Sequence, residues 1–138
     1  MSVVRGKRGV TKLKVIDEAE KLANYTINIV SNEQHFPKRY RWVYSGKIAD
    51  AALRVNSLVH EANSFAPKDK AEMRIRIKFI IEAIASIADL HSLVSLARQQ
   101  KDVDLTNLEY WLNSTTYVKT LLLKWRETSR KALLDLPD

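Results

Sequence analysis

The stretch PKDKAEMRIRIKFIIEAIASIADLHSLVSLAR, residues 67–98, decides the fold class. Steps of three and four, the spacing of one helix face, separate the members of one row: Met73, Ile77, Ile80, Ile84, Ile87, His91 and Val94. Residues 74–79 alternate basic and apolar side chains with a period of two, which is typical of a strand when read alone. The alternation is short and runs without a turn into the helical pattern, and Pro67 can occupy the first turn of a helix. We therefore predict a helix over residues 67–100.

Three further segments show the same helical spacing. A helix over residues 12–34 is predicted by the row Leu13, Ile16, Ala23, Ile27 and Val30, and one over residues 38–63 by the row Tyr44, Ile48, Ala51, Val55, Leu58 and Ala62. A fourth helix, over residues 107–134, has the clearest start, because Thr106 as N-cap and Glu109 three residues later form a capping box. The row of this last helix is Leu108, Trp111, Thr115, Val118, Leu122, Trp125 and Ser129.

The four segments are amphipathic and are joined by short loops. This pattern predicts an all-α fold, an antiparallel up-and-down four-helix bundle over residues 11–138. Residues 1–10 are basic and have no apolar periodicity, so we expect a flexible N-terminal arm there. A length of 138 residues fits a single domain.

The composition excludes several classes of function. Only 3 glycines are present, and Gly6, Gly9 and Gly46 do not have the spacing of a P-loop or of a dinucleotide-binding loop. The absence of cysteine excludes disulfides, thiolate metal sites and a cysteine nucleophile. No uncharged apolar run approaches the length that spans a bilayer. We expect a cytoplasmic protein that does not contact membranes.

Signals for catalysis and metal binding are poor. The pair His60-Glu61 begins an H-E-x-x-H zinc motif, but the fifth position is Ser64, so the second ligand is missing. None of the 3 histidines has the Glu-x-x-His spacing of a di-iron bundle. His91 lies in an apolar row, and we expect it in the core or partly buried. We predict no catalytic residue, no metal site, no cofactor and no enzymatic activity.

The charge is the most informative feature of the composition. With 23 Lys and Arg against 16 Asp and Glu, the formal net charge is +7, which favours a polyanionic partner. An up-and-down topology brings many of the basic residues to one end of the bundle. The candidates for nucleic-acid contact are Arg5, Lys7, Arg8, Lys68, Lys70, Arg74, Arg76, Lys78, Arg126, Arg130 and Lys131.

Two alternatives to nucleic-acid contact remain for these cations. Arg126, Arg130 and Lys131 are near the end of the last helix, where a cation is stabilised by the helix dipole. The cations from Lys68 to Lys78 lie at the start of a helix, where the positive end of the helix dipole repels them. This position favours contact with an external anion. The alternative is an ordinary solvated face.

At the opposite end, cations and aromatic residues interleave in the segment Phe36-Pro37-Lys38-Arg39-Tyr40-Arg41-Trp42. Helical spacing places Trp42 away from the core row, and an exposed tryptophan beside arginine suits base stacking or a protein contact. The alternative is a ring folded over the adjoining loop. The candidates for partner binding are Lys38, Arg39, Arg41 and Trp42. Trp111, Val118 and Trp125 recur every seven residues, which indicates a core or a subunit interface.

The order of these features resembles a family of small four-helix bundles. The family includes the accessory variability determinant (Avd) of diversity-generating retroelements and the proteins encoded in 23S rRNA intervening sequences. The resemblance covers about residues 11–131 and rests on Phe36-Pro37-Lys38 with Arg41, on the basic and apolar opening of the third helix followed by Leu90, Leu93, Leu96 and Arg98, and on Val118, Leu122 and Trp125. Where family members often carry a glycine-rich segment before the tryptophan, this chain has Lys119-Thr-Leu-Leu-Leu-Lys-Trp125.

The resemblance implies a homopentamer with a basic surface. Such a protein binds a reverse transcriptase and its template RNA, and possibly the cDNA, and supports mutagenic reverse transcription without catalysing it. The alternative is a structural or regulatory bundle of the intervening-sequence type that acts only through protein–protein contacts.

Overall fold

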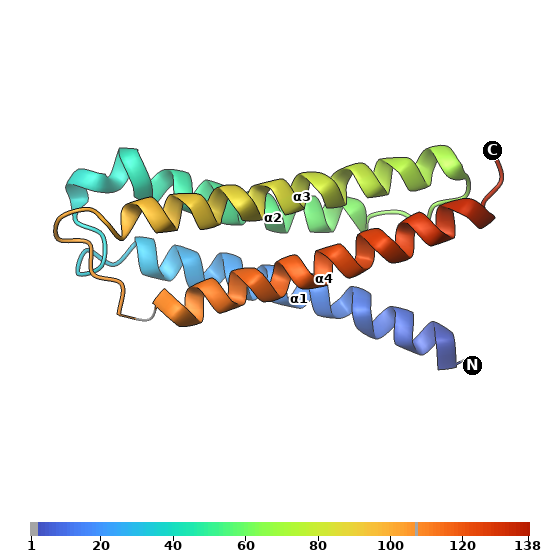
Figure 1. Ribbon diagram of the computed structural model, residues 1–138, viewed down its shortest axis with the longest axis horizontal. Coiled ribbons are helices and arrows are strands. Elements are labelled where there is room, and N and C mark those ends of the chain that lie inside the picture. The colour runs from blue at the N-terminus through green and yellow to red at the C-terminus, as the bar shows by residue number, and fades with distance from the viewer. Residues whose placement is uncertain (1–2, 107) are drawn as a thin grey trace.

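We describe the fold from a computed structural model, which gives the backbone of residues 3–106 and 108–138 and the side chains of residues 14–106 and 108–138. Its α-helices are α1 (Val3–Val30), α2 (Gly46–Ala62), α3 (Lys70–Ala97) and α4 (Leu108–Asp135). A 3₁₀ turn, η1 (Lys38–Tyr40), and a π-helical turn, η2 (Arg41–Ser45), precede α2 (Figure 1). No strand occurs within these described ranges, and the predicted all-α four-helix bundle is confirmed.

Each helix packs against two neighbours. Helices α1 and α3 both contact α2 and α4. Figure 1 shows that the α1–α2 and α3–α4 connections lie at one end of the bundle, and that the α2–α3 connection lies at the other end with the C-terminus. We call these the α1–α2 end (residues 31–45 and 98–106) and the α2–α3 end (residues 63–69 and 136–138).

The observed boundaries differ from the expected ones on the N-terminal half of the chain. The structure assigns residues 3–10 to α1, where we expected a separate arm, and α1 ends at Val30 instead of residue 34. Regular α-helix begins only at Gly46, because residues 38–45 form the turns η1 and η2. A Cβ at Gly46 would lie 3.3 Å from the carbonyl oxygen of Arg41, so the π turn brings the backbone close at this glycine.

Helix α3 begins later than expected. Asp69 is its N-cap, and the Asp69 side chain accepts a hydrogen bond from the Glu72 N–H at 2.9 Å. The Glu72 carboxylate in turn accepts from the N–H of Lys68, the residue before the N-cap, at 3.3 Å. Pro67 therefore lies before the helix and not in its first turn.

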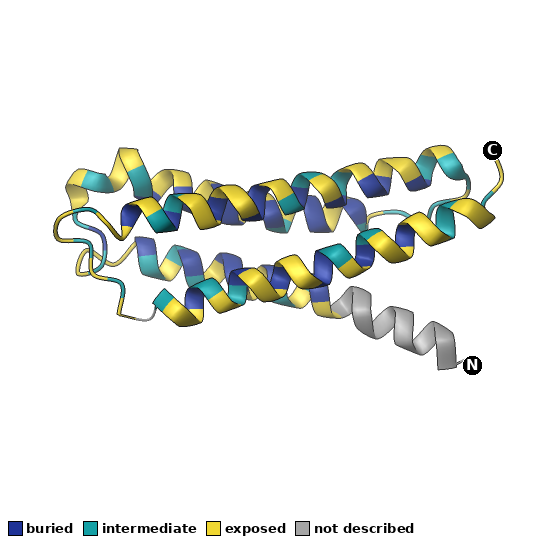
Figure 2. Cartoon of the chain, in the orientation of Figure 1, coloured by how far each residue is buried: buried dark blue, intermediate teal, exposed yellow. Residues whose placement is uncertain are grey.

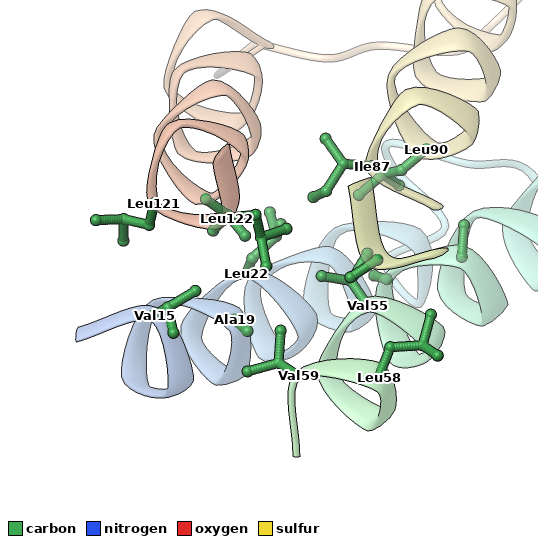
Figure 3. Packing of buried hydrophobic residues seen from close by; sticks show 14 of the residues in the cluster. Val15, Ala19, Leu22, Val55, Leu58, Val59, Ile87, Leu90, Leu121 and Leu122 are labelled. Atoms are coloured by element: carbon green, nitrogen blue, oxygen red, sulfur yellow. The ribbon is translucent and has the colours of Figure 1, made fainter. Parts of the chain in front are cut away.

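One apolar stripe from each helix forms the core (Figure 2), and Figure 3 shows Val15, Leu22, Val55, Ile87 and Leu122 converging in it. The predicted rows are buried for most of α2, α3 and α4. Trp111, Val118 and Trp125 are core residues of the single chain.

Two details of the predicted rows are wrong. In α1 the buried residues include Val15, Ala19 and Leu22, whereas Ile16 and Ile27 are only partly buried. In α3 the buried row continues through Leu90 and Val94, and His91 is exposed. Most of the buried residues of α3 recur every seven residues, as Met73, Ile80, Ile87 and Val94 together with Arg76, Ala83, Leu90 and Ala97. The predicted row instead took the residue four positions after each member of the first set, and along the helix that position moves from buried Ile77 to exposed His91.

Candidate nucleic-acid interface

Arg76 belongs to the interior and not to an exposed basic face. Its side chain is 5% exposed, and its Nε donates to the carbonyl oxygen of Ala62 at 2.9 Å while Nη2 donates to that of Phe65. The guanidinium carbon lies 5.7 Å from the ring centroids of both Phe65 and Trp125. Burial lowers the pKa of Arg76.

Arg76 therefore holds the end of α2 and the following loop against α3, and the prediction that it contacts nucleic acid is wrong. The sequence did carry a signal of this role. Arg76 stands three residues after Met73 and four before Ile80, so it occupies a position in the buried row of α3.

The N-terminus of α3 is satisfied by the chain itself. The Lys70 N–H donates to the carbonyl oxygen of Pro137 at 2.9 Å, and Lys70 Nζ lies 3.4 Å from the Asp138 carboxylate. Asp138, Asp69 and Glu72 thus offset the cations whose position against the helix dipole favoured an external anion. Lys70 has an internal partner, while the side chain of Lys68 is exposed.

The remaining predicted cations on α3 and α4 are open to solvent. Arg74 and Lys78 on α3 and Arg130 and Lys131 on α4 are exposed. Arg126 is partly buried, and its Nε has no hydrogen-bond partner among the described residues. The ion pairs found among the described side chains include none of these five residues.

Packing of α3 on α4 places several of these cations at similar levels along the bundle. The contact between Arg76 and Trp125 places the two positions at the same level of the bundle. Since α3 and α4 run in opposite directions (Figure 1), Arg74 lies within about one helical turn of the levels of Arg126 and Arg130 along the bundle axis. We call the following set the basic surface: Lys68, Arg74, Lys78, Arg126, Arg130 and Lys131. The side chains of Arg5, Lys7 and Arg8 lie outside the described residues.

The opposite end of the bundle is held by Arg39. Its Nη2 donates to the Asp102 carboxylate at 2.6 Å and to the carbonyl oxygen of Lys101 at 3.0 Å. The Tyr40 hydroxyl donates to the same carbonyl at 2.8 Å. The hydrogen bond to Asp102 raises the pKa of Arg39. Arg39 therefore ties η1 to the α3–α4 connection, where Asp102 adopts a left-handed conformation with φ of 67°.

Trp42 is directed into solvent, as expected, with 86% of its surface exposed, and the neighbouring Val43 is 53% exposed. Lys38 pairs with Glu33 at 3.6 Å, and both side chains are exposed. Arg41 is exposed beside a hollow of about 320 Å³ between the end of α1 and η2. Its lining consists of Val30, Ser31, Glu33, Phe36, Pro37, Lys38, Arg41, Ser45, Gly46 and Ala49. We call Lys38, Arg41, Trp42 and Val43 the Trp42 corner.

The histidines lie apart from one another in the bundle. His35 Nδ1 is 2.7 Å from the carbonyl oxygen of Asp104, and His60 Nε2 is 3.1 Å from the Glu20 carboxylate. Within residues 14–106 and 108–138, no three His, Cys, Asp or Glu side chains gather as a metal site would require.

Helix α3 is also long and apolar enough to cross a membrane by length and composition, with a mean hydropathy of 1.6 over its most apolar window. A third of that window is buried inside the bundle. A core helix passes the same test, and the buried row from Ile77 to Val94 gives α3 that place.

Comparison with known proteins adds no assignment: no family model, curated protein or solved structure matches this chain.

Proposed function

We propose that this chain is a non-enzymatic accessory protein that holds nucleic acid on the basic surface and assists a reverse transcriptase. The observation that carries the proposal is the group of cations on the basic surface, all exposed except the partly buried Arg126, to which the described part of the chain supplies no ionic partner. Cations clustered on one face are the electrostatic footprint of a nucleic-acid-binding protein. The net charge of +7 adds a long-range attraction for polyanions.

The accessory role comes from the resemblance to the Avd family, and the Trp42 corner is the place where we propose that the reverse transcriptase docks. An exposed tryptophan next to an apolar residue and a cation has the composition of an interface anchor. Arg39 pairs with Asp102 and supports this corner, and its half-exposed side chain lies beside it. The bound nucleic acid would be template RNA and possibly cDNA, and the assembly a homopentamer of the 15.9 kDa chain.

Titration of labelled RNA at several salt concentrations tests the nucleic-acid part. Each neutralised phosphate contributes about −0.7 to −0.9 to the slope of log affinity against log salt. The variant Arg74→Glu/Lys78→Glu should lower the affinity by about tenfold or more. It should also reduce the magnitude of that slope by the contribution of roughly two phosphate contacts. The control Lys47→Glu/Lys101→Glu changes the charge equally at exposed positions of the opposite half and should have a much smaller effect.

The outcomes separate the two candidate functions. A flat salt response in the native protein would refute nucleic-acid binding and favour the bundle that acts only through protein contacts. Equal losses in the two double variants would show that the net charge, and not the basic surface, determines affinity.

The docking part needs a separate measurement with a purified reverse transcriptase of a diversity-generating retroelement. Trp42→Ala should weaken that complex and leave RNA affinity unchanged. An unaltered complex would exclude the Trp42 corner as the docking site.

A further inference from the structure

The aromatic rings nearest the basic surface already pack against other side chains of the bundle. Phe65 and Trp125 both face the Arg76 guanidinium, at 5.7 Å from each ring centroid. Trp125 is buried, and Phe65 is partly buried. Phe79, next to Lys78 in the sequence, packs against the core cluster. These rings are not open platforms on which a base could stack.

The exposed aromatic rings of the described residues are elsewhere. Trp42 lies at the α1–α2 end, and Tyr110 is near the start of α4, where it stacks edge-on with Tyr25 at 4.9 Å. Tyr117 lies beneath Lys14 of α1, whose Nζ is 5.8 Å from the ring centroid. The basic surface and the exposed rings therefore occupy different parts of the bundle.

The spacing of the cations is regular because they project from two rigid helices. Arg74 and Lys78 are four residues apart on α3, and so are Arg126 and Arg130 on α4. A separation of four residues corresponds to about 6 Å along a helix, and packed helices lie about 8–10 Å apart. The surface thus presents two short rows of positive charge on the faces of a helix pair.

Paired and unpaired nucleic acids place different demands on such a surface. Proteins that hold single strands combine a positive groove with aromatic rings on which successive bases stack. A duplex hides its bases, presents phosphates at higher density along its axis, and releases more counterions for each phosphate that is neutralised. A rigid surface that is rich in cations and has no open aromatic ring gains more binding free energy from the duplex.

We infer that the basic surface binds the backbone of a base-paired nucleic acid in preference to an unpaired strand. The inference rests on the proposed function and specifies its substrate: paired segments of the RNA, or a duplex formed during copying, would lie across α3 and α4. Recognition would be through phosphates, without base-specific contacts.

The test compares two labelled probes with equal numbers of phosphates, a base-paired RNA hairpin and an oligouridylate, by fluorescence anisotropy at low salt. The hairpin should bind about tenfold more tightly or better, and Arg74→Glu/Lys78→Glu should remove most of that preference. Trp42→Ala should leave the hairpin affinity unchanged, because the exposed indole is on another part of the bundle.

Three results would overturn the inference. Oligouridylate could bind as tightly as the hairpin, the preference could survive in Arg74→Glu/Lys78→Glu, or Trp42→Ala could weaken the hairpin as much as that double variant does. Each leaves nucleic-acid binding itself intact. Failure of both probes to bind at low salt would instead refute the proposed function.

Discussion

Replacement of Arg76 by methionine tests whether this arginine is structural. Arg76→Met keeps most of the aliphatic packing and removes two charge-assisted hydrogen bonds, to the carbonyl oxygens of Ala62 and Phe65. Each such bond contributes about 1.5–3 kcal/mol, and two acceptors would be left without their donor. Relief of the desolvation of a buried cation offsets part of this loss. We expect a net decrease of about 2–4 kcal/mol in the free energy of unfolding.

The measurement is urea denaturation followed by circular dichroism. A loss of this size should lower the midpoint by about 1–2 M, given a typical dependence of about 1–3 kcal/mol per M for small domains. Arg74→Met is the matched control, because it makes the same change two residues away at an exposed position, and it should stay within about 0.5 kcal/mol of the native protein. The free energy of unfolding of Arg76→Lys should lie between those of Arg76→Met and Arg74→Met. The lysine ammonium retains the charge but lacks the planar guanidinium that reaches two carbonyl oxygens.

The pH dependence is a further check on the same variant. Burial lowers the pKa of Arg76 in the folded state, so the unfolded chain binds the proton more tightly and stability should rise as pH rises through the folded pKa. Arginine stays protonated across the accessible range, and the difference between Arg76→Met and the native protein should be constant from about pH 5 to pH 9. A stability within about 0.5 kcal/mol of the native protein would refute the structural role.

Two further predictions concern the interior. Asn56 has a buried Oδ1 without a partner among the described residues, so Asn56→Leu should raise the free energy of unfolding by about 1–2 kcal/mol, and a lower urea midpoint would contradict this reasoning. Trp111 donates from Nε1 to the Thr26 hydroxyl at 3.0 Å, so Trp111→Phe should cost about 2–4 kcal/mol. Adding Thr26→Val to Trp111→Phe should recover part of that loss, because the hydroxyl that loses its donor is then removed as well. If the changes in the free energy of unfolding of the two single variants simply add up in the double variant, the hydrogen bond contributes nothing.

Much of the fold could be predicted because its signals are local. The rows on α2 and α4 fall on the buried faces, since three- and four-residue spacing is a property of the helix itself. Errors appear where local rules compete with packing. His91 was expected in the core or partly buried but is exposed, and η1 and η2 replace the first turns expected for the second helix.

The candidate sites were harder to predict, because a cation's role depends on partners that are distant in sequence. Arg39 reaches Asp102 and Lys101 across the α1–α2 end. Lys70 meets Pro137 and Asp138 at the opposite end. Neither partner can be identified from periodicity or charge counts, whereas the exposure of Trp42 followed from its place relative to the core row.

The sequence alone determined that this chain is helical, that it forms a bundle and that it is basic, since periodicity, capping and charge are read residue by residue. Only the tertiary structure decided which basic residues remain available. Packing placed Arg76 between Phe65 and Trp125, where its charge serves the fold, and left Arg74, two residues away, exposed. The physical reason is that two residues correspond to about 200° around a helix, so Arg76 and Arg74 lie on opposite faces, and contacts with the neighbouring helices decide which face is buried.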